Sequence, residues 1–177
     1  MPKRGLVVMI RGPIGAGKTT LMQGLARTTT YRLWALDTDA VSSHHPGDPY
    51  GEHLEIEWPL EIDILSLHAR IILGRGLNLV LDPGLFLTSK NVDRFLKGVG
   101  RSRRDRKVVM IRLMVSPRAA VRRKTTLAPA YIRASHKGWQ TSAIPGEIVI
   151  DTDGLSPAQV LRVAKRALRE RIPTPSR

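Results

Sequence analysis

The segment from Gly12 to Thr19 (GPIGAGKT) constrains the chain more than any other part of the sequence. It matches the pattern Gly-x4-Gly-Lys-Ser/Thr, directly after an apolar run and directly before a stretch with helical character. Glycines in such a loop let successive backbone N–H groups turn toward phosphate oxygens, and the helix N-terminus adds a partial positive charge. The pattern predicts that Lys18 reaches the β- and γ-phosphates of ATP and that the Thr19 hydroxyl is a ligand of Mg²⁺. The expected nucleotide-binding residues are Gly12, Pro13, Ile14, Gly15, Ala16, Gly17, Lys18, Thr19 and Thr20.

Short apolar runs alternate with helical stretches along the chain, which is typical of an α/β fold with a parallel sheet covered on both faces. A proline suits the first turn of a helix, because its missing N–H has no intrahelical partner there. This places helix starts at Pro59, Pro117 and Pro157, with an irregular segment at 41–58 and another, with room for a short helix, at 127–145. The expected strands are Gly5–Arg11, Tyr31–Leu36, Leu77–Leu81, Lys107–Val115 and Glu147–Ile150, and the expected helices are Lys18–Thr28, Pro59–Gly74, Ser89–Val99, Pro117–Lys124 and Pro157–Ile172.

Length and composition predict one globular domain. The chain has 177 residues, 42% of them hydrophobic, which suffices for a core, and we expect a domain over residues 1–172 with a disordered tail at 173–177. Because there is no cysteine, disulfide scaffolds, thiolate metal sites and cysteine nucleophiles are excluded. The sequence shows neither a signal peptide nor an apolar run long enough to span a membrane, so a cytoplasmic protein is expected.

The basic charge is concentrated in one part of the chain. The formal net charge is +14, and residues 90–140 carry 15 Lys and Arg against 2 Asp and Glu. The tract 101–107 precedes an expected strand and should lie at the end remote from the phosphate loop, whereas the basic residues after that strand should lie beside the loop. A solvated surface explains such an imbalance as readily as a nucleic-acid partner does.

Carboxylates follow two of the expected strands. Asp37 and Asp39 come after the second strand, and Asp82 comes after the third. Ligands of parallel α/β sheets bind beyond the carboxyl ends of the strands. A carboxylate there can accept the proton of an attacking hydroxyl or help to hold magnesium, although an Asp can equally serve as a helix cap or turn residue.

Phosphate loops occur in kinases, GTPases, motors and assembly ATPases, so the loop alone does not decide the reaction. The sequence has no Asn/Thr-Lys-x-Asp guanine motif, and motor and ring-forming ATPases usually need longer chains. Small size and a carboxylate after the second strand favour a kinase. A nucleotide-binding ATPase or regulator without an acceptor is the alternative from another class.

Five segments, in this order along the chain, together resemble small P-loop kinases. They are the phosphate loop, the run from Leu36 to Val41 (LDTDAV), the run NLVLDPG at 78–84, the Arg-bearing segment Ser116–Lys124 and the run from Val149 to Pro157 (VIDTDGLSP). The group includes polynucleotide 5′-kinases, chloramphenicol phosphotransferase-like enzymes and zeta-toxin-like kinases, with gluconate and shikimate kinases more distant. The resemblance implies a three-layer P-loop NTPase fold with a five-stranded parallel sheet. It also implies that Asp39 is the acceptor-side base and that the loop from Asp153 to Pro157 lies near the adenine.

The resemblance further implies a mobile basic lid at about 116–145. Arg118, Arg122 and Arg123 begin this lid and would stabilise the charge on the transferred phosphoryl group. The expected acceptor-side residues are Asp37, Asp39, His44, Asp82 and Arg133, and the expected metal ligands are Thr19 and Asp82.

The sequence thus predicts an ATP- and Mg²⁺-dependent kinase that phosphorylates a hydroxyl group. The basic middle of the chain favours a nucleic-acid or nucleoside acceptor. Two features favour a small molecule instead: the acidic segment Glu52–Asp63, and the apolar run Pro83–Leu87, where polynucleotide kinases have polar residues. The oligomeric state is left open.

Overall fold

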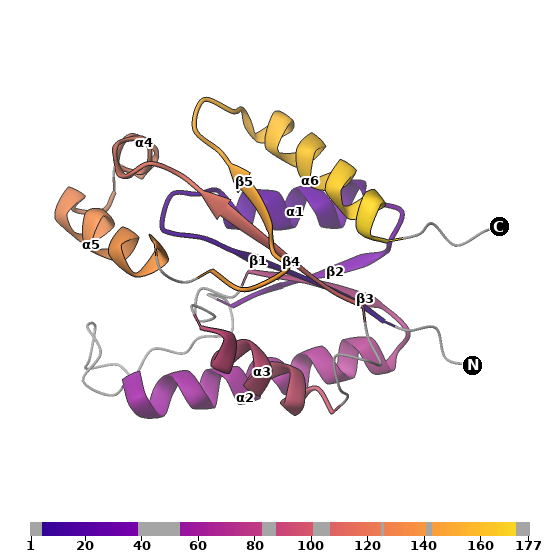
Figure 1. The fold of residues 1–177 in the computed structure, drawn as a ribbon. Coiled ribbons are helices and arrows are strands. Elements are labelled where there is room, and N and C mark those ends of the chain that lie inside the picture. The colour runs from indigo at the N-terminus through magenta and orange to yellow at the C-terminus, as the bar shows by residue number, and fades with distance from the viewer. Residues whose placement is uncertain are drawn as a thin grey trace.

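The computed structural model describes residues 5–38, 54–82, 88–100, 107–124, 126–140 and 143–172. Five parallel strands form one sheet in the order β2-β3-β1-β4-β5, with helices on both faces (Figure 1). This confirms the predicted α/β class and the five-stranded parallel sheet. The strands are β1 Leu6–Arg11, β2 Leu33–Asp37, β3 Asn78–Asp82, β4 Lys107–Met114 and β5 Ile148–Asp151, and the helices are α1 Lys18–Thr28, α2 Leu54–Gly74, α3 Ser89–Gly98, α4 Pro117–Arg123, α5 Pro129–Gln140 and α6 Pro157–Arg171.

The central strand β1 is buried along its whole length and divides the core into two layers. Because side chains alternate along a strand, Val8 and Ile10 pack on the side of α1 and α6, whereas Val7 and Met9 pack on the side of α2 and α3. Figure 1 shows these two helix pairs on opposite faces of the sheet, with α4 and α5 beyond the carboxyl ends of the strands. A parallel sheet covered in this way explains why the strands read as short, nearly continuous apolar runs.

Two of the three prolines begin helices as predicted. Pro117 opens α4 after the N-cap Ser116, and Pro157 opens α6 after the N-cap Ser156, which forms a capping box with Gln159. The predicted start at Pro59 is wrong, because α2 begins at Leu54 and includes Pro59 in its interior. A proline there removes one intrahelical hydrogen bond, and the helix, with 21 residues in all, is long enough to tolerate the loss.

The two segments predicted as irregular have different outcomes. The end of segment 41–58 is helical, because α2 starts at Leu54, and positions 41–53 lie outside the described residues. The segment 127–145 contains α5, which fulfils the expectation of a short helix there. The predicted tail at 173–177 also lies outside the described residues.

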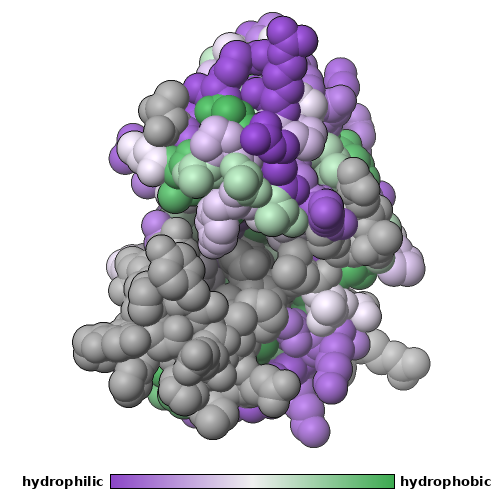
Figure 2. All heavy atoms as spheres, turned by 90° about the vertical axis from the view of Figure 1, so that its left-hand side faces the viewer, coloured by the Kyte–Doolittle hydropathy of each residue, from purple (hydrophilic) through white to green (hydrophobic). Residues whose placement is uncertain are grey.

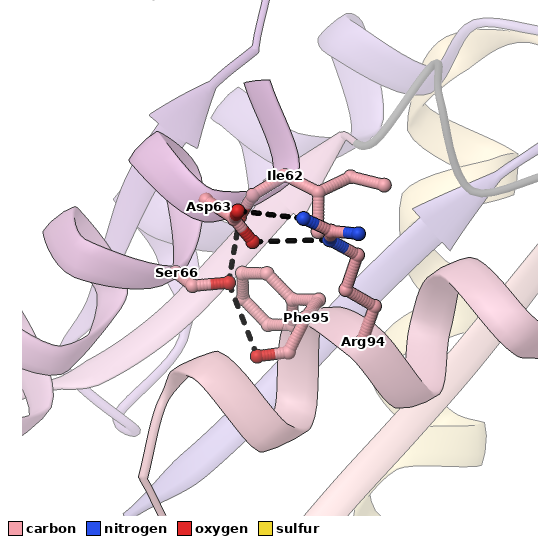
Figure 3. Close-up of polar contacts among 5 residues, drawn as sticks. All are labelled: Ile62, Asp63, Ser66, Arg94 and Phe95. Atoms are coloured by element: carbon pink, nitrogen blue, oxygen red, sulfur yellow. Dashed lines mark hydrogen bonds and ion pairs between the residues drawn. The ribbon is translucent and has the colours of Figure 1, made fainter. Parts of the chain in front are cut away.

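Helices α2 and α3 pack closely against each other (Figure 3). Ser66 of α2 donates its hydroxyl to the carbonyl of Ile62 at 2.6 Å and to that of Phe95 in α3 at 3.2 Å. A Cβ atom on Gly98 would lie 2.7 Å from the Ser66 side chain, so glycine allows this approach. At the exposed edge of the same contact, Arg94 donates two hydrogen bonds to Asp63 and lowers the pKa of that carboxyl. None of the described helices is long and apolar enough to cross a membrane.

Candidate functional site

The predicted phosphate loop connects the end of β1 to the start of α1, at the carboxyl edge of the sheet. Two of its glycines are required by close approach as well as by backbone conformation. A Cβ on Gly12 (φ +153°) would lie 2.4 Å from the carbonyl oxygen of Leu113, and one on Gly15 (φ +79°) would lie 2.9 Å from the Ala120 side chain. The loop is therefore held tightly between β4 and α4, which fixes its curvature.

Lys18 and Thr19 begin α1 and lie where the motif predicts. The Lys18 ammonium lies 3.5 Å from the carbonyl oxygen of Pro13, so the side chain folds back over the loop. The Thr19 hydroxyl donates a hydrogen bond of 3.1 Å to the Asp82 carboxylate. The loop lysine and a hydroxyl–carboxylate pair thus lie at one end of the sheet.

Asp82 ends β3 and is only 5% exposed. It stands beside Asp37 in the parallel register of β2 and β3, and its carbonyl accepts a hydrogen bond of 2.7 Å from the hydroxyl of Thr38. Hydroxyl and carboxylate oxygens are the donors that Mg²⁺ prefers, so Thr19 and Asp82 fit the predicted metal. Among the described residues, no cluster of three or more His, Cys, Asp and Glu side chains offers another metal site.

A pocket of about 930 Å³ opens over the phosphate loop. Its walls come from the loop, β3, α4, α5 and the start of α6, so it joins segments that are far apart in the sequence. Leu155 and Pro157 are among its lining residues, and the position of this segment near the adenine stays a prediction. Of the predicted nucleotide-binding residues, Pro13 alone is not part of the lining, which comprises Gly12, Ile14, Gly15, Ala16, Gly17, Lys18, Thr19, Thr20, Leu21, Asp82, Arg123, Lys124, Leu127, Tyr131, Ala134, Ser135, Trp139, Thr152, Leu155, Pro157 and Val160.

The predicted lid arginines fall into two groups. Arg123 lines the pocket and donates to the carbonyl of Gly15 at 3.3 Å, to the hydroxyl of Thr152 at 2.9 Å and to the carbonyl of Thr152 at 2.6 Å. Arg118, Arg122 and Arg133 are exposed and are not among the lining residues. The structure therefore brings one of the four predicted arginines into contact with the phosphate loop.

Two predicted acceptor-side residues, Asp39 and His44, lie outside the described residues. Asp37, which precedes them, lies at the end of β2 on the same sheet edge as Asp82.

His136 is a site residue that the sequence analysis missed. Its Nε2 lies 3.2 Å from the carbonyl oxygen of Ile14, so a proton on Nε2 joins α5 to the phosphate loop. The signal was present in the spacing of Ile132, His136 and Trp139, which places three side chains on one face of a helix. All three are buried in the structure.

A buried charged cluster beneath α5 was also missed. Arg11 of β1 forms an ion pair with Glu147, and burial lowers the pKa of its guanidinium. Arg11 also lies over the ring of Trp139, at 5.2 Å from the ring centre, and Arg112, its neighbour in the β1–β4 register, donates to the Trp139 carbonyl. The cluster attaches the end of α5 to the centre of the sheet. The signal for it was an arginine within the apolar run of each of two strands, Arg11 at the end of β1 and Arg112 near the end of β4.

The loop after β5 is linked to the start of α4. The backbone N–H of Ser116 donates to the carboxylate of Asp153 at 3.0 Å. Hydrogen bonding to Ser116, with a smaller contribution from Arg123 and Arg122, lowers the pKa of Asp153. The loop after β5 and the start of α4 are thus joined by a charge-assisted contact.

Basic residues gather on the face that carries α4 and α5. Viewed from that side, hydrophilic residues, interspersed with hydrophobic ones, gather on the upper part of the molecule (Figure 2). The exposed basic residues there are Arg118, Arg122, Arg123, Lys124, Arg133 and Lys137. The remote tract at 101–106 lies outside the described residues, and Lys107 pairs with Leu6 at the opposite end of the sheet from the phosphate loop.

Solved structures with this fold include kinases. The chain is similar to a sugar kinase from Janibacter sp. HTCC2649, with a TM-score of 0.70 and 21% identity over 93% of this chain and 94% of that one. It is similar to a gluconokinase from Sinorhizobium meliloti 1021, with a TM-score of 0.68 and 14% identity over 96% and 93% of the two chains. It is also similar to the Mycobacterium tuberculosis APS kinase CysC in complex with AMPPNP and APS, with a TM-score of 0.65 and 16% identity over 95% and 99%.

These likenesses show the P-loop kinase fold. No curated protein gives a significant match. The narrower resemblance to polynucleotide 5′-kinases, chloramphenicol phosphotransferase-like enzymes and zeta-toxin-like kinases stays a prediction. A family model described as an AAA domain, AAA_33, matches residues 7–128. Because that match spans more than half of the sequence, from β1 through α4, the chain belongs to the AAA_33 family of AAA domains.

Proposed function

We propose that the protein is an ATP- and Mg²⁺-dependent kinase that transfers the γ-phosphoryl group to a hydroxyl group of a small molecule. The observation that carries the proposal is the Thr19–Asp82 contact at the rim of the phosphate-loop pocket. It joins the predicted magnesium ligand of the loop to a buried carboxylate on the neighbouring β3 strand. A phosphate loop beside such a hydroxyl–carboxylate pair can bind a nucleoside triphosphate and hold the metal at its phosphates.

Different residues of the chain are proposed to bind the nucleotide, hold the metal and activate the acceptor. The loop amides and Lys18 bind the phosphates, while Thr19 and Asp82 would hold magnesium, which, when bound, neutralises charge on the transferred group. Asp39 is proposed to accept the proton of the acceptor hydroxyl, with Asp37, His44 and Arg133 on the acceptor side. Arg118, Arg122 and Arg123 are proposed to stabilise charge on the phosphoryl group as it moves.

A small-molecule acceptor replaces the nucleic-acid acceptor that the sequence favoured. The similar structures named above are a sugar kinase, a gluconokinase and an APS kinase in complex with APS. The exposed arginines also belong to α4 and α5, two helices that contribute to the wall of the phosphate-loop pocket, where phosphoryl transfer itself accounts for a positive charge. The apolar run Pro83–Leu87 agrees with this choice.

The test is a transfer assay with γ-labelled ATP, Mg²⁺ and a panel of sugars, sugar acids, antibiotics, nucleosides and oligonucleotides. We expect label on a small hydroxyl compound, no transfer by Lys18→Ala, and a large loss with Asp39→Asn. Label released only as inorganic phosphate with every acceptor would identify an ATPase and contradict the kinase proposal. Transfer to oligonucleotides, with affinity that falls steeply as salt rises, would return the assignment to a nucleic-acid acceptor.

A further inference from the structure

Tyr131 is a large aromatic residue that lines the pocket over the phosphate loop and is 56% exposed. It lies near the start of α5. Aromatic rings bury a large apolar area when a partner covers them, and pockets for small molecules are commonly lined by such rings. Because more than half of Tyr131 is open to solvent within a concave site, its ring is available to a bound molecule.

Helix α5 turns an uncharged side toward this pocket. Its lining residues are spaced three or four positions apart, along one side of the helix, and they are Tyr131, Ala134, Ser135 and Trp139. The arginine and the lysine of the helix, Arg133 and Lys137, are exposed and do not belong to the lining. This side of α5 therefore suits a flat, uncharged group better than a phosphate, for which the loop amides and Lys18 are placed.

Apolar side chains from two other segments line the same pocket. Leu127 lies between α4 and α5, and Leu155 and Pro157 belong to the segment that leads into α6, which is predicted to lie near a bound base. Arg123 at the end of α4 donates to Thr152 of that segment, and Figure 1 shows α4 and α5 together beyond the carboxyl ends of the strands. The pocket thus offers an aromatic ring and aliphatic side chains, the two kinds of surface against which a planar base packs.

The lining side chains provide no carboxylate that would favour guanine. Guanine presents its N1–H and its 2-amino group as donors, and a site selects it over adenine by offering them buried acceptors. Asp82 is the one carboxylate among the described lining residues, and it accepts the hydroxyl of Thr19 beside the phosphate loop. The hydroxyl of Thr152 already accepts from Arg123 and donates to the carbonyl of Met114.

We propose that Tyr131 stacks on the base of a bound nucleoside triphosphate, and that the site accepts ATP and GTP alike in preference to pyrimidine nucleotides. The proposal rests on the proposed function in one respect, that the phosphate loop binds the triphosphate. Every base has a π-face, so stacking tolerates the exchange of one purine for the other. A pyrimidine ring covers less of the tyrosine ring and gains less from the contact.

The first experiment is calorimetric titration, in the presence of Mg²⁺, with nonhydrolysable analogues of ATP and GTP and with inorganic tripolyphosphate. We expect Tyr131→Ala to weaken the binding of both analogues about tenfold and to leave the affinity for tripolyphosphate, which has no base, unchanged. Tyr131→Phe keeps the ring and should bind like the parent. Lys137→Ala, at an exposed position of the same helix outside the lining, is the matched control.

Three results of this titration would count against the proposal. Equal losses for tripolyphosphate and for the analogues would show that Tyr131→Ala acts through the structure of the pocket and not through a base. Unchanged affinity for the analogues in Tyr131→Ala would place the ring away from the nucleotide. A parent chain that binds neither the analogues nor tripolyphosphate would contradict the proposed function itself, before any variant is compared.

The second experiment compares ADP, GDP, CDP and UDP on the parent and on Tyr131→Ala. We expect ADP and GDP to bind within about fivefold of each other and CDP and UDP to bind about tenfold more weakly, with a smaller gap in Tyr131→Ala. GDP binding about a hundredfold more weakly than ADP would refute the tolerance for both purines. Equal affinities of the parent for all four nucleotides would refute stacking as the source of selectivity.

Discussion

Arg123 donates hydrogen bonds to both the side chain and the backbone of Thr152, to its hydroxyl at 2.9 Å and to its carbonyl at 2.6 Å. The Thr152 hydroxyl in turn donates to the carbonyl of Met114 at the end of β4. Because Arg123 also reaches the carbonyl of Gly15, one guanidinium joins α4, the phosphate loop and the segment after β5. In the described conformation this arginine positions the walls of the pocket, and for transfer it would have to exchange these oxygens for those of the nucleotide.

The first prediction concerns this arginine. Arg123→Lys keeps the charge but cannot donate two parallel hydrogen bonds, so we expect a loss of about 1–2 kcal/mol in stability and a weaker binding of ATP. Thermal unfolding and calorimetric titration with a nonhydrolysable ATP analogue measure the two effects. Arg118→Lys, at an exposed position of the same helix, should leave the melting temperature unchanged. Equal melting temperatures for Arg123→Lys and the parent would contradict a positioning role.

The second prediction concerns the contact between His136 and the carbonyl of Ile14. His136→Phe removes the donor while keeping a ring, and we expect nucleotide affinity to fall by about 1 kcal/mol, roughly fivefold. His136→Gln can still donate and should recover part of the affinity. Lys137→Ala changes the exposed neighbour and serves as the control. If His136→Phe lowered the melting temperature but left the dissociation constant of the ATP analogue unchanged, the histidine would be purely structural.

The third prediction separates Thr19 from its neighbour Thr20. Thr19→Ala removes the hydroxyl that binds Asp82, and we expect the Mg²⁺ concentration needed for half-maximal activity to rise about 10- to 100-fold. Thr19→Ser keeps a hydroxyl and should behave like the parent. Thr20→Ala should change nucleotide affinity without changing the dependence on Mg²⁺. An identical magnesium titration for Thr19→Ala and Thr20→Ala would remove Thr19 from the proposed metal site.

The fourth prediction concerns the buried pair of Arg11 and Glu147. Glu147→Ala leaves the buried guanidinium of Arg11 beside Arg112 without its carboxylate, and we expect a loss of about 3–5 kcal/mol in unfolding free energy. Replacing both partners, as in Arg11→Met with Glu147→Leu, should recover most of that loss. Urea denaturation of Arg11→Met, Glu147→Leu and the double variant, beside Glu147→Ala, provides the measurement. Additive losses in the double variant would show that the pair does not interact energetically.

The fifth prediction is a pH dependence from Asp153. Its folded pKa is below the usual value near 4, so its contact with Ser116 stabilises the protein above that value. The contribution is lost as the pH falls through the folded pKa. Asp153→Asn should therefore show a flatter stability profile below about pH 4 than the parent. Since Asp153 is exposed, added salt should reduce the difference. Parallel profiles at low salt would exclude this contribution.

Local patterns in the sequence were sufficient to predict much of the fold. The phosphate loop is encoded in eight consecutive residues, and prolines marked the starts of α4 and α6 because each follows a capping serine. Pro59 was misleading because the sequence around a proline does not show whether it opens a helix or lies within a longer one that has already begun. The placement of Asp82 beside Thr19 followed from strand polarity, which any parallel sheet imposes.

Contacts between distant segments were not predictable in the same way. His136 meets Ile14 across 122 positions, and Arg123 meets Gly15 across 108. Such pairs depend on how α4 and α5 pack over the sheet, and no local spacing encodes that packing.

The strand order also sets when the phosphate loop can form as the protein is made. The ribosome delivers β1 and the loop before both neighbours of β1, because β3 and β4 come from residues 78–114. The carbonyl of Leu113 and the side chain of Ala120 lie against Gly12 and Gly15, so the loop lacks its supports until about residue 120 has left the exit tunnel. The phosphate loop is thus synthesised well before its supports, and nascent chains should gain nucleotide binding only after α4 has emerged.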